Sequence, residues 1–245
     1  MKENSIMSKS HAEFYEELVK SIINAGHIKP EDFPNIDLYM DQVTTFMSSE
    51  LEGTKSHPED KMLTKTMINN YAKDNLLPSP IKKKYSKDHM ITLLFIYYLK
   101  NILSISDIQN ILTPLNERFF ASDNKTSDVT MDEIYKNIYR TVVEEIEDIS
   151  NDVAKKIAIS EQTFTDVNNN DEKDFLQYFS LICMLSYDIF AKKQILTALV
   201  DKLKDEENGR KAHEAEVKKA EAEAKKAESK KTEPKKEKKQ GKESR

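Results

Sequence analysis

The sequence predicts an all-α protein, and three observations support this. The chain has 4 glycines and 7 prolines in 245 residues, whereas sheet-rich folds use many turns built from these residues. Apolar residues recur three or four positions apart along most of the chain, which is the helical spacing. Hydrophobic residues make up 38% and charged residues 33%. We therefore expect helices that bury a real core and keep a well-solvated outer surface.

The N-terminal part predicts two helices. Residues 11–25 carry apolar side chains at helical spacing, and Gly26 supplies a stop. Two prolines mark the connection that follows. A second helix is expected over residues 38–51, and residues 53–60 form a loop.

A third, short helix is expected over Leu63–Asn75. Thr64 is suited to cap it, and Met67, Ile68 and Tyr71 form its inward stripe. The prolines of the following Leu77-Pro78-Ser79-Pro80 segment cannot continue a helix. The opposite face of this helix presents short polar and basic side chains: Lys65, Thr66, Asn69, Asn70 and Lys73.

The next segment, Ile81–Tyr85, is expected to be a short extended or turn piece. It carries three successive lysines, Lys82, Lys83 and Lys84. Ser86 then caps an apolar helix that runs to about Ile102, and Ser104 opens another helix that we expect Pro114 to close.

The C-terminal half predicts two longer helices. Thr130 opens an amphipathic pattern that packs on a partner, from this chain or another. After a loop over Asp166–Asp174, Phe175–Leu203 is apolar on most sides, so we expect a buried helix with Cys183 in the core. Beyond Asp205 the composition is Ala, Glu and Lys, which predicts a frayed helix passing into disorder.

Charge is distributed unevenly along the chain. The formal net charge is -5, yet residues 61–100 contain 8 lysines and 2 aspartates, a net +6. An acidic protein with one compact basic window repels a polyanion everywhere except at that window. This asymmetry directs attention to the short helix and the lysine-rich segment.

A short polar helix beside a lysine-rich segment is suited to bind double-stranded DNA. A major groove admits one helix, short donor and acceptor side chains near its start read base edges, and lysines around it neutralise phosphates. Thr66, Asn69 and Asn70 suit the bases. Lys65, Lys73 and Lys82–Lys84 suit the backbone. On charge alone, a solvated helix face beside a basic loop is an equal alternative.

The residues in this region resemble the recognition helix of the MerR family and the segments that follow it. The resemblance is carried by Thr66-Met67-Ile68-Asn69-Asn70-Tyr71 with Leu76-Leu77-Pro78, by the wing end Tyr85-Ser86, and by Ser104-Ile105-Ser106-Asp107-Ile108. It implies a winged helix-turn-helix with a minimal wing. It also implies that Tyr71 takes a packing and phosphate-contact position.

The sequence departs from that family at informative positions. Asn69 and Asn70 stand where Arg and Tyr are usual, Lys82–Lys84 replace the wing's Gly-Tyr-Arg, and Asn75 replaces a common glycine. Together with Pro34–Gln42, the region also resembles an uncharacterised Gram-positive bacterial family with a MerR-like domain. Some of its members are described as transcriptional repressors.

Other chemistry is not supported. The five histidines are scattered without a neighbouring cysteine, which argues against zinc, and Asp166–Asp171 lacks the glycine of a calcium loop. No nucleophile motif or phosphate-binding glycine loop is present, so we expect neither enzyme activity nor a cofactor. One cysteine and the lack of an apolar leader indicate a reducing cytoplasm, and no segment reads as a membrane span.

We therefore expect a DNA-binding domain at residues 10–115, a helical dimerisation or effector domain at 128–205 and a charged tail at 206–245. The predicted function is a dimeric transcription regulator, with repression favoured and an unidentified small-molecule or protein effector as a further partner. The alternative is an adaptor that keeps the winged-helix shape but binds a protein.

Overall fold

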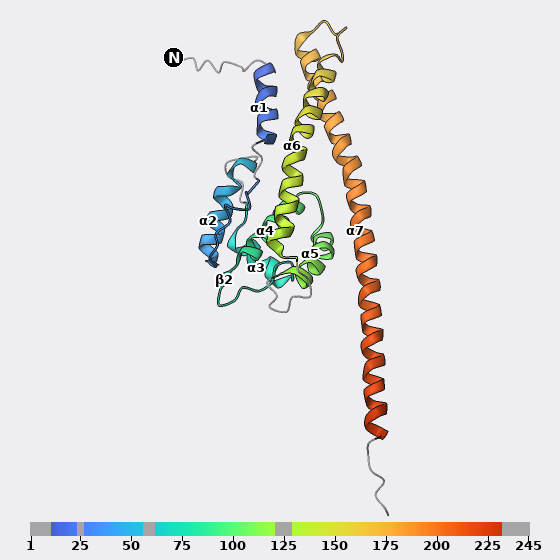
Figure 1. Cartoon of the computed structure of the whole chain (residues 1–245). Helices are drawn as coiled ribbons and strands as arrows, with labels where there is room; N and C mark the ends of the chain where they lie inside the picture. The colour runs from blue at the N-terminus through green and yellow to red at the C-terminus, as the bar shows by residue number, and fades with distance from the viewer. Residues whose placement is uncertain (1–10, 24–26, 56–61, 121–128, 232–245) are drawn as a thin grey trace, which may run out of the picture. The chain divides into compact units, whose positions relative to one another are not determined.

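The computed structural model describes residues 11–23, 27–55, 62–120 and 129–231. Within these residues the protein has seven α-helices, one short 3-10 helix and a two-stranded sheet, so the predicted all-helical class is confirmed (Figure 1). The chain divides into two compact units, Met1–Val200 and Asp201–Arg245.

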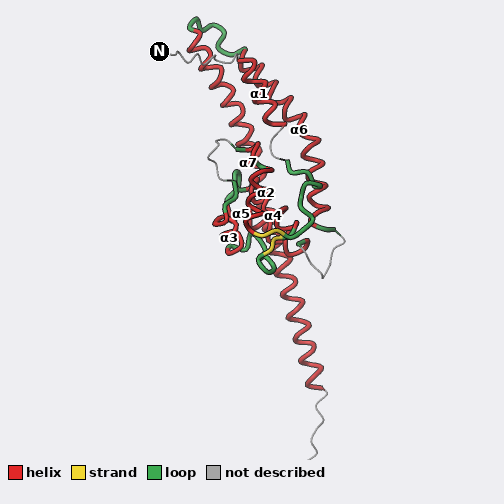
Figure 2. The backbone as a smooth tube through the Cα atoms, turned by 90° about the vertical axis from the view of Figure 1, so that its left-hand side faces the viewer, coloured by secondary structure: helices red, strands yellow, loops and turns green. Residues whose placement is uncertain are grey.

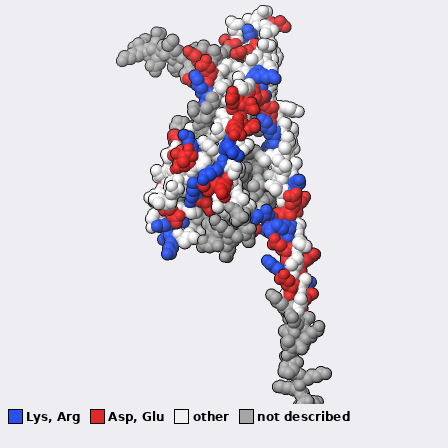
Figure 3. All heavy atoms as spheres, viewed as in Figure 1, with Lys and Arg blue, Asp and Glu red and all other residues white. Residues whose placement is uncertain are grey.

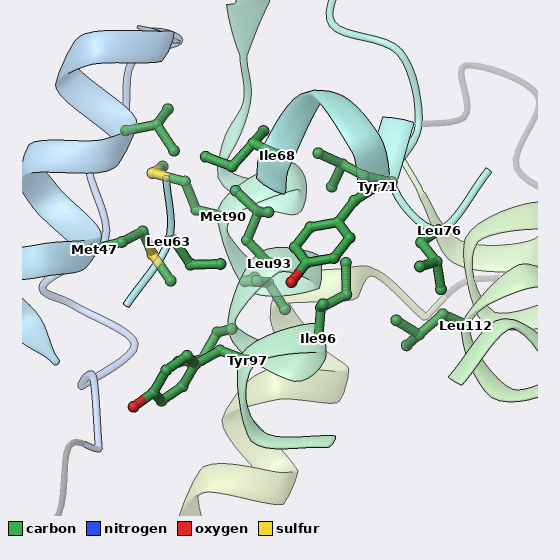
Figure 4. Packing of buried hydrophobic residues seen from close by; sticks show 14 of the residues in the cluster. Met47, Leu63, Ile68, Tyr71, Leu76, Met90, Leu93, Ile96, Tyr97 and Leu112 are labelled. Carbon is green, nitrogen blue, oxygen red and sulfur yellow. The ribbon is translucent and has the colours of Figure 1, made fainter. Parts of the chain in front are cut away.

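Helix α4 (Lys87–Leu99) is the centre of the main core. Ser86 begins it as predicted, and eight of its side chains are buried, so it is surrounded on nearly every side. Figure 4 shows Met90, Leu93 and Ile96 of α4 facing Ile68 and Tyr71 of the preceding short helix. A helix that is apolar all round has to be covered by several neighbours.

Two strands and two helices cover one side of α4. Strand β1 (Leu38–Tyr39) runs directly into α2 (Met40–Glu50), and the 3-10 turn η1 (Glu52–Thr54) follows. Helix α3 (Lys65–Lys73) comes next, and strand β2 (Lys84–Tyr85) leads into α4. The strands pair antiparallel, with Leu38 opposite Tyr85 and Tyr39 opposite Lys84. This small sheet is drawn yellow in Figure 2.

Helix α5 (Ile105–Phe119) corrects one expectation. Ser104 caps it as predicted, with its hydroxyl accepting the Asp107 N–H at 3.2 Å, but Pro114 lies inside the helix and does not end it. A proline within a helix removes one backbone hydrogen bond. Here Leu112 before it is buried and Leu115 after it packs on the same core, which holds the helix across the break.

Helix α6 (Met131–Glu161) starts inside the main core and leaves it further along. Thr130 and Glu133 form a reciprocal capping box at its start. Met131 and Tyr135 are buried, and the Tyr135 hydroxyl donates to the Ile28 carbonyl. Further along, α6 packs with α1 (His11–Ile23), where Tyr15 joins a second, smaller core cluster.

Helix α7 (Asn170–Lys231) differs most from expectation. It starts inside the segment predicted as a loop, because the Asn169 side chain accepts the backbone N–H groups of its first turn. The predicted burial of Phe175–Leu203 is wrong for much of that stretch. Phe175 and Ile182 are exposed, and so is Cys183, which was expected in the core. Within this stretch Leu181 is buried in the second cluster and Val200 in the main core.

The second unit is a helical extension. Helix α7 continues to Lys231, whereas the sequence predicted fraying into disorder beyond Asp205. Alanine, glutamate and lysine are strong helix formers, and pairs such as Arg210 with Glu207 and Glu214 add support at helical spacing. The last part of the predicted tail, 232–245, lies outside the described residues. Among the described residues, no helix combines the length and apolar character needed to cross a bilayer.

Candidate nucleic-acid interface

Helix α3 is anchored on one face and open on the other. The Thr64 hydroxyl accepts the Met67 N–H at 3.2 Å, so Thr64 is the predicted cap. Ile68 is fully buried and Tyr71 nearly so, which fixes the rotation of the helix. The five side chains predicted for the opposite face are all exposed: Lys65, Thr66, Asn69, Asn70 and Lys73.

Tyr71 belongs to the core and not to this exposed face. Its ring lies among α4 side chains in Figure 4, and burial raises the pKa of its hydroxyl. The structure thus supports its packing role. The phosphate contact of Tyr71 stays a prediction.

The exit from α3 is held by a backbone motif and by α5. Asn75 has a positive φ of 56°, the left-handed conformation that glycine or asparagine adopts after a helix. The Leu76 N–H donates to the Tyr71 carbonyl at 2.9 Å. From α5, the Gln109 amide donates to the Asp74 carbonyl at 2.6 Å and the Asn116 amide to the Leu76 carbonyl at 3.3 Å. Sequence reasoning missed both α5 residues, because no spacing rule connects positions so far apart.

The segment predicted as a wing, which we continue to call the wing, is a two-residue hairpin with lysine at both central positions. Ile81 bridges Lys84 across the turn, and the Lys84 N–H donates to the Ile81 carbonyl at 2.9 Å. Lys82 and Lys83 have positive φ values of 51° and 65°. Two successive positive φ values mark the type I′ turn, which favours Asn-Gly. Left-handed backbone costs an ordinary residue about 1–2 kcal/mol, so this turn keeps its lysines at the expense of stability.

The wing and α3 meet at the start of α2. The Lys84 ammonium lies 5.4 Å from the centre of the Tyr39 ring, and Lys65 forms an ion pair with Asp41. Tyr39 and Asp41 are two residues apart, so both lysines lie beside the same short segment. We call the exposed side chains of α3 together with Lys82–Lys84 the α3–wing face. Figure 3 shows blue atoms gathered at the tip of the loop beside the β2 label of Figure 1.

Two lysines of the basic window are used inside the fold. Lys87 donates to the Pro30 carbonyl at 3.0 Å and pairs with Asp132 of α6 at 2.7 Å. Lys100 donates to the Met62 carbonyl at 3.0 Å, and burial lowers its pKa. The positive charge that faces outward is therefore narrower than the composition of residues 61–100 suggests, and it is concentrated on the α3–wing face.

His89 supports the base of the wing. Its Nδ1 accepts the Ser86 N–H at 3.0 Å, the position that Glu or Gln takes in a capping box. Its ring lies edge-on to Tyr85 of β2 at 5.3 Å and to Phe120 at 4.6 Å. Burial lowers the His89 pKa, so the neutral ring is favoured. The Ser-x-x-His spacing before an apolar helix was the signal available in the sequence.

Groups suited to metal chemistry do not gather here. Among the residues that the structure describes, no three His, Cys, Asp or Glu side chains are placed to hold a metal ion. The α3–wing face instead offers hydroxyl and amide groups beside ammonium groups. That combination suits hydrogen bonding to base edges together with neutralisation of phosphates.

Part of the chain matches a known protein family. Residues 28–138 match the family described as a domain of unknown function, DUF1836. The DUF1836 region begins at the buried Ile28, contains the whole α3–wing face and ends in the first turns of α6. It therefore includes the Lys87–Asp132 pair, which joins α4 to α6. Searches of curated proteins and of solved structures found no match to this chain.

Proposed function

We propose that this protein is a sequence-specific DNA-binding transcription regulator that acts in the cytoplasm as a dimer, as a repressor at a near-palindromic operator. The observation that carries the proposal is the junction at Tyr39–Asp41, where Lys84 of the wing and Lys65 of α3 lie beside one segment. A polar helix face and a basic hairpin in one place are the two parts that a winged helix-turn-helix needs. A MerR-like winged helix-turn-helix fold for this region is part of the same proposal.

In the proposed mechanism, α3 enters the major groove. Asn69 and Asn70 face outward from a helix that its buried side fixes in rotation, so they can reach base edges. Asparagine forms a paired hydrogen bond with adenine N6 and N7, so adenine is the base we expect them to select. Lys82 and Lys83 at the hairpin tip contact the neighbouring phosphates.

Lys65 has a double role in this mechanism. Its side chain pairs with Asp41 in the free protein, and both side chains are well exposed. An exposed ion pair contributes little to stability, so a phosphate can replace Asp41 as the partner at small cost. Lys65 is thereby held at the start of α3, where the helix dipole also favours an anion.

A mobility-shift assay on the DNA upstream of the protein's own gene tests the proposal. We expect a discrete shift at low salt that weakens when Lys82, Lys83 and Lys84 are changed to alanine. Changing Lys202, Lys204 and Lys218 to alanine is a matched control, because these are three exposed lysines of the second unit, outside the α3–wing face. Absence of any shift, or a shift that the triple variant leaves unchanged, would contradict the proposal.

A protein-binding adaptor is the second candidate. Ile36 and Ile81, which flank the sheet and the wing, are both exposed, and apolar side chains beside a basic hairpin also suit a protein partner. Genome-wide chromatin immunoprecipitation separates the two functions, because an adaptor yields no discrete DNA sites.

A further inference from the structure

Helix α7 carries an exposed apolar stripe that the described part of the chain leaves uncovered. We call it the α7 seam and define it by five residues: Phe175, Phe179, Ile182, Ser186 and Ile189. Its four apolar side chains are between 53% and 67% exposed. Soluble monomers seldom expose a continuous patch of large apolar side chains. All five residues lie within the first unit of the chain.

The spacing of the α7 seam is that of a coiled coil. Its members follow one another at intervals of four, three, four and three residues, which is the repeat that keeps one stripe facing a partner helix. Scattered apolar surface residues would not show this regularity. The stripe therefore has the pattern of a helix-packing surface.

A second stripe on the same part of α7 is already packed. Tyr178, Leu181 and Leu185 are also three and four residues apart, and they contact Tyr15 of α1 and Ile157 of α6. At about 100° per residue, the packed stripe and the α7 seam lie roughly a quarter-turn apart on the helix surface. A helix with two adjacent packing stripes belongs to a bundle with more than the neighbours present here.

We infer that the α7 seam binds the α7 seam of a second copy of this chain, with the two helices antiparallel. The inference gives the dimer of the proposed function its interface. Phe179 lies near one end of the seam, and Ser186 and Ile189 form the other. Antiparallel packing places the aromatic end of each copy against the smaller end of its partner. Parallel packing would crowd the phenylalanines together and leave two serines facing each other.

Charge at the two ends favours the same orientation. Asp171 and Glu172 precede the α7 seam, Lys192 and Lys193 follow it, and all four are exposed. In an antiparallel pair each acidic end lies beside the partner's basic end. In a parallel pair like charges would meet at both ends, which is unfavourable in helix pairs.

The surface is large enough for a stable pair. An aromatic side chain has about 150–250 Å² to bury, so one that is half to two-thirds exposed offers about 100 Å² or more. If all of it is buried, the exposed area of the seam's apolar side chains and of the neighbouring Phe190 comes to about 1,000 Å² from two copies, which is the lower limit for a specific interface. Flanking residues add to this area.

Sedimentation velocity of the full chain, without DNA, tests the interface. We expect a dimer at micromolar concentration, and we expect Ile182→Asp to weaken it by about 100-fold or more, as for a central interface residue. Ile195→Asp is the matched control, because Ile195 is 64% exposed on the same helix but lies outside the seam. A monomeric wild type would overturn the inference, and so would a dimer that Ile182→Asp leaves intact while its circular dichroism stays native.

The orientation has its own test. Lys192→Glu with Lys193→Glu is expected to weaken the dimer, and adding Asp171→Lys with Glu172→Lys is expected to restore it. A spin label at Gln194→Cys in a Cys183→Ser background measures the geometry directly. Twelve residues from Ile182 at about 1.5 Å each predict labels about 35 Å apart in the antiparallel pair. A separation of about 10 Å would show parallel packing and overturn the orientation.

These measurements distinguish a failure of the α7 seam from a failure of the DNA-binding role. If the protein is a monomer and still shifts its upstream DNA, the role of the α7 seam is contradicted and the DNA-binding role is not. A dimer that binds no DNA would do the reverse.

Discussion

One variant of the wing hairpin is expected to make the protein more stable and to weaken its binding to DNA. Lys82 and Lys83 both have positive φ, which Asn-Gly adopts with less strain. Lys82→Asn with Lys83→Gly should raise the free energy of unfolding by about 1–2 kcal/mol. For a domain of this size that is a rise in Tm of about 2–8 °C. Thermal unfolding followed by circular dichroism measures it.

The same variant should bind DNA more weakly. Each lost phosphate contact removes about 0.9 from the slope of log K against log salt, so two lysines remove about 1.8. At about 0.1 M salt, relative to 1 M, this corresponds to a loss of affinity of roughly 60-fold. Fluorescence anisotropy across a salt series measures both values. Lower stability would refute the type I′ turn, and unchanged affinity with an unchanged slope would refute the role of the lysines.

Three further predictions concern the parts that support the interface. Burial lowers the His89 pKa below its ordinary value of 6.5. The stabilising contribution of the neutral ring should therefore be fully present above pH 6.5 and should be lost as the pH falls toward the pKa of the folded state. His89→Gln keeps the capping acceptor but cannot take up a proton. Between pH 7 and pH 5, on either side of the ordinary histidine pKa of about 6.5, its free energy of unfolding in urea should therefore fall less than that of the wild type. Lys87→Met leaves Asp132 without its partner from α4 and should cost about 2 kcal/mol, whereas an unchanged midpoint would mean that the pair is not needed. At the left-handed position 75, Asn75→Ala should lower stability by about 1 kcal/mol relative to Asn75→Gly, and the reverse order would contradict the motif at the end of α3.

Local signals in the sequence predicted where several helices begin. Thr64, Ser86, Ser104 and Thr130 were each expected to begin a helix, and each does. These predictions succeed because a cap and the first helical turn lie within four residues of each other. The outward face of α3 followed in the same way from the stripe of buried residues on its other side.

Contacts between distant segments were beyond such reasoning. No pattern links Asn116 to the Leu76 carbonyl or Lys87 to Asp132, because each contact depends on how α4, α5 and α6 pack. Pro114 failed as a stop for the same reason, since packing on both sides of it outweighs one lost hydrogen bond.

The expected burial of the α7 stretch was wrong for a different reason. An apolar helix shows that a surface needs covering, but its sequence does not say whether the cover comes from the same chain. In the structure α1 and α6 cover one stripe of α7, and the α7 seam stays exposed.

Chromatin immunoprecipitation with sequencing, comparing the wild type with an Asn69→Ala, Asn70→Ala variant, tests the central claim most directly. Both asparagines are exposed on α3, so the change should leave the fold intact. We expect discrete wild-type sites that share a near-palindromic motif, with half-sites about 10 base pairs apart or a multiple of that. We expect the variant to lose these sites. Wild-type enrichment no higher than that of an untagged control, or sites that the variant keeps unchanged, would contradict the assignment of the α3–wing face to DNA.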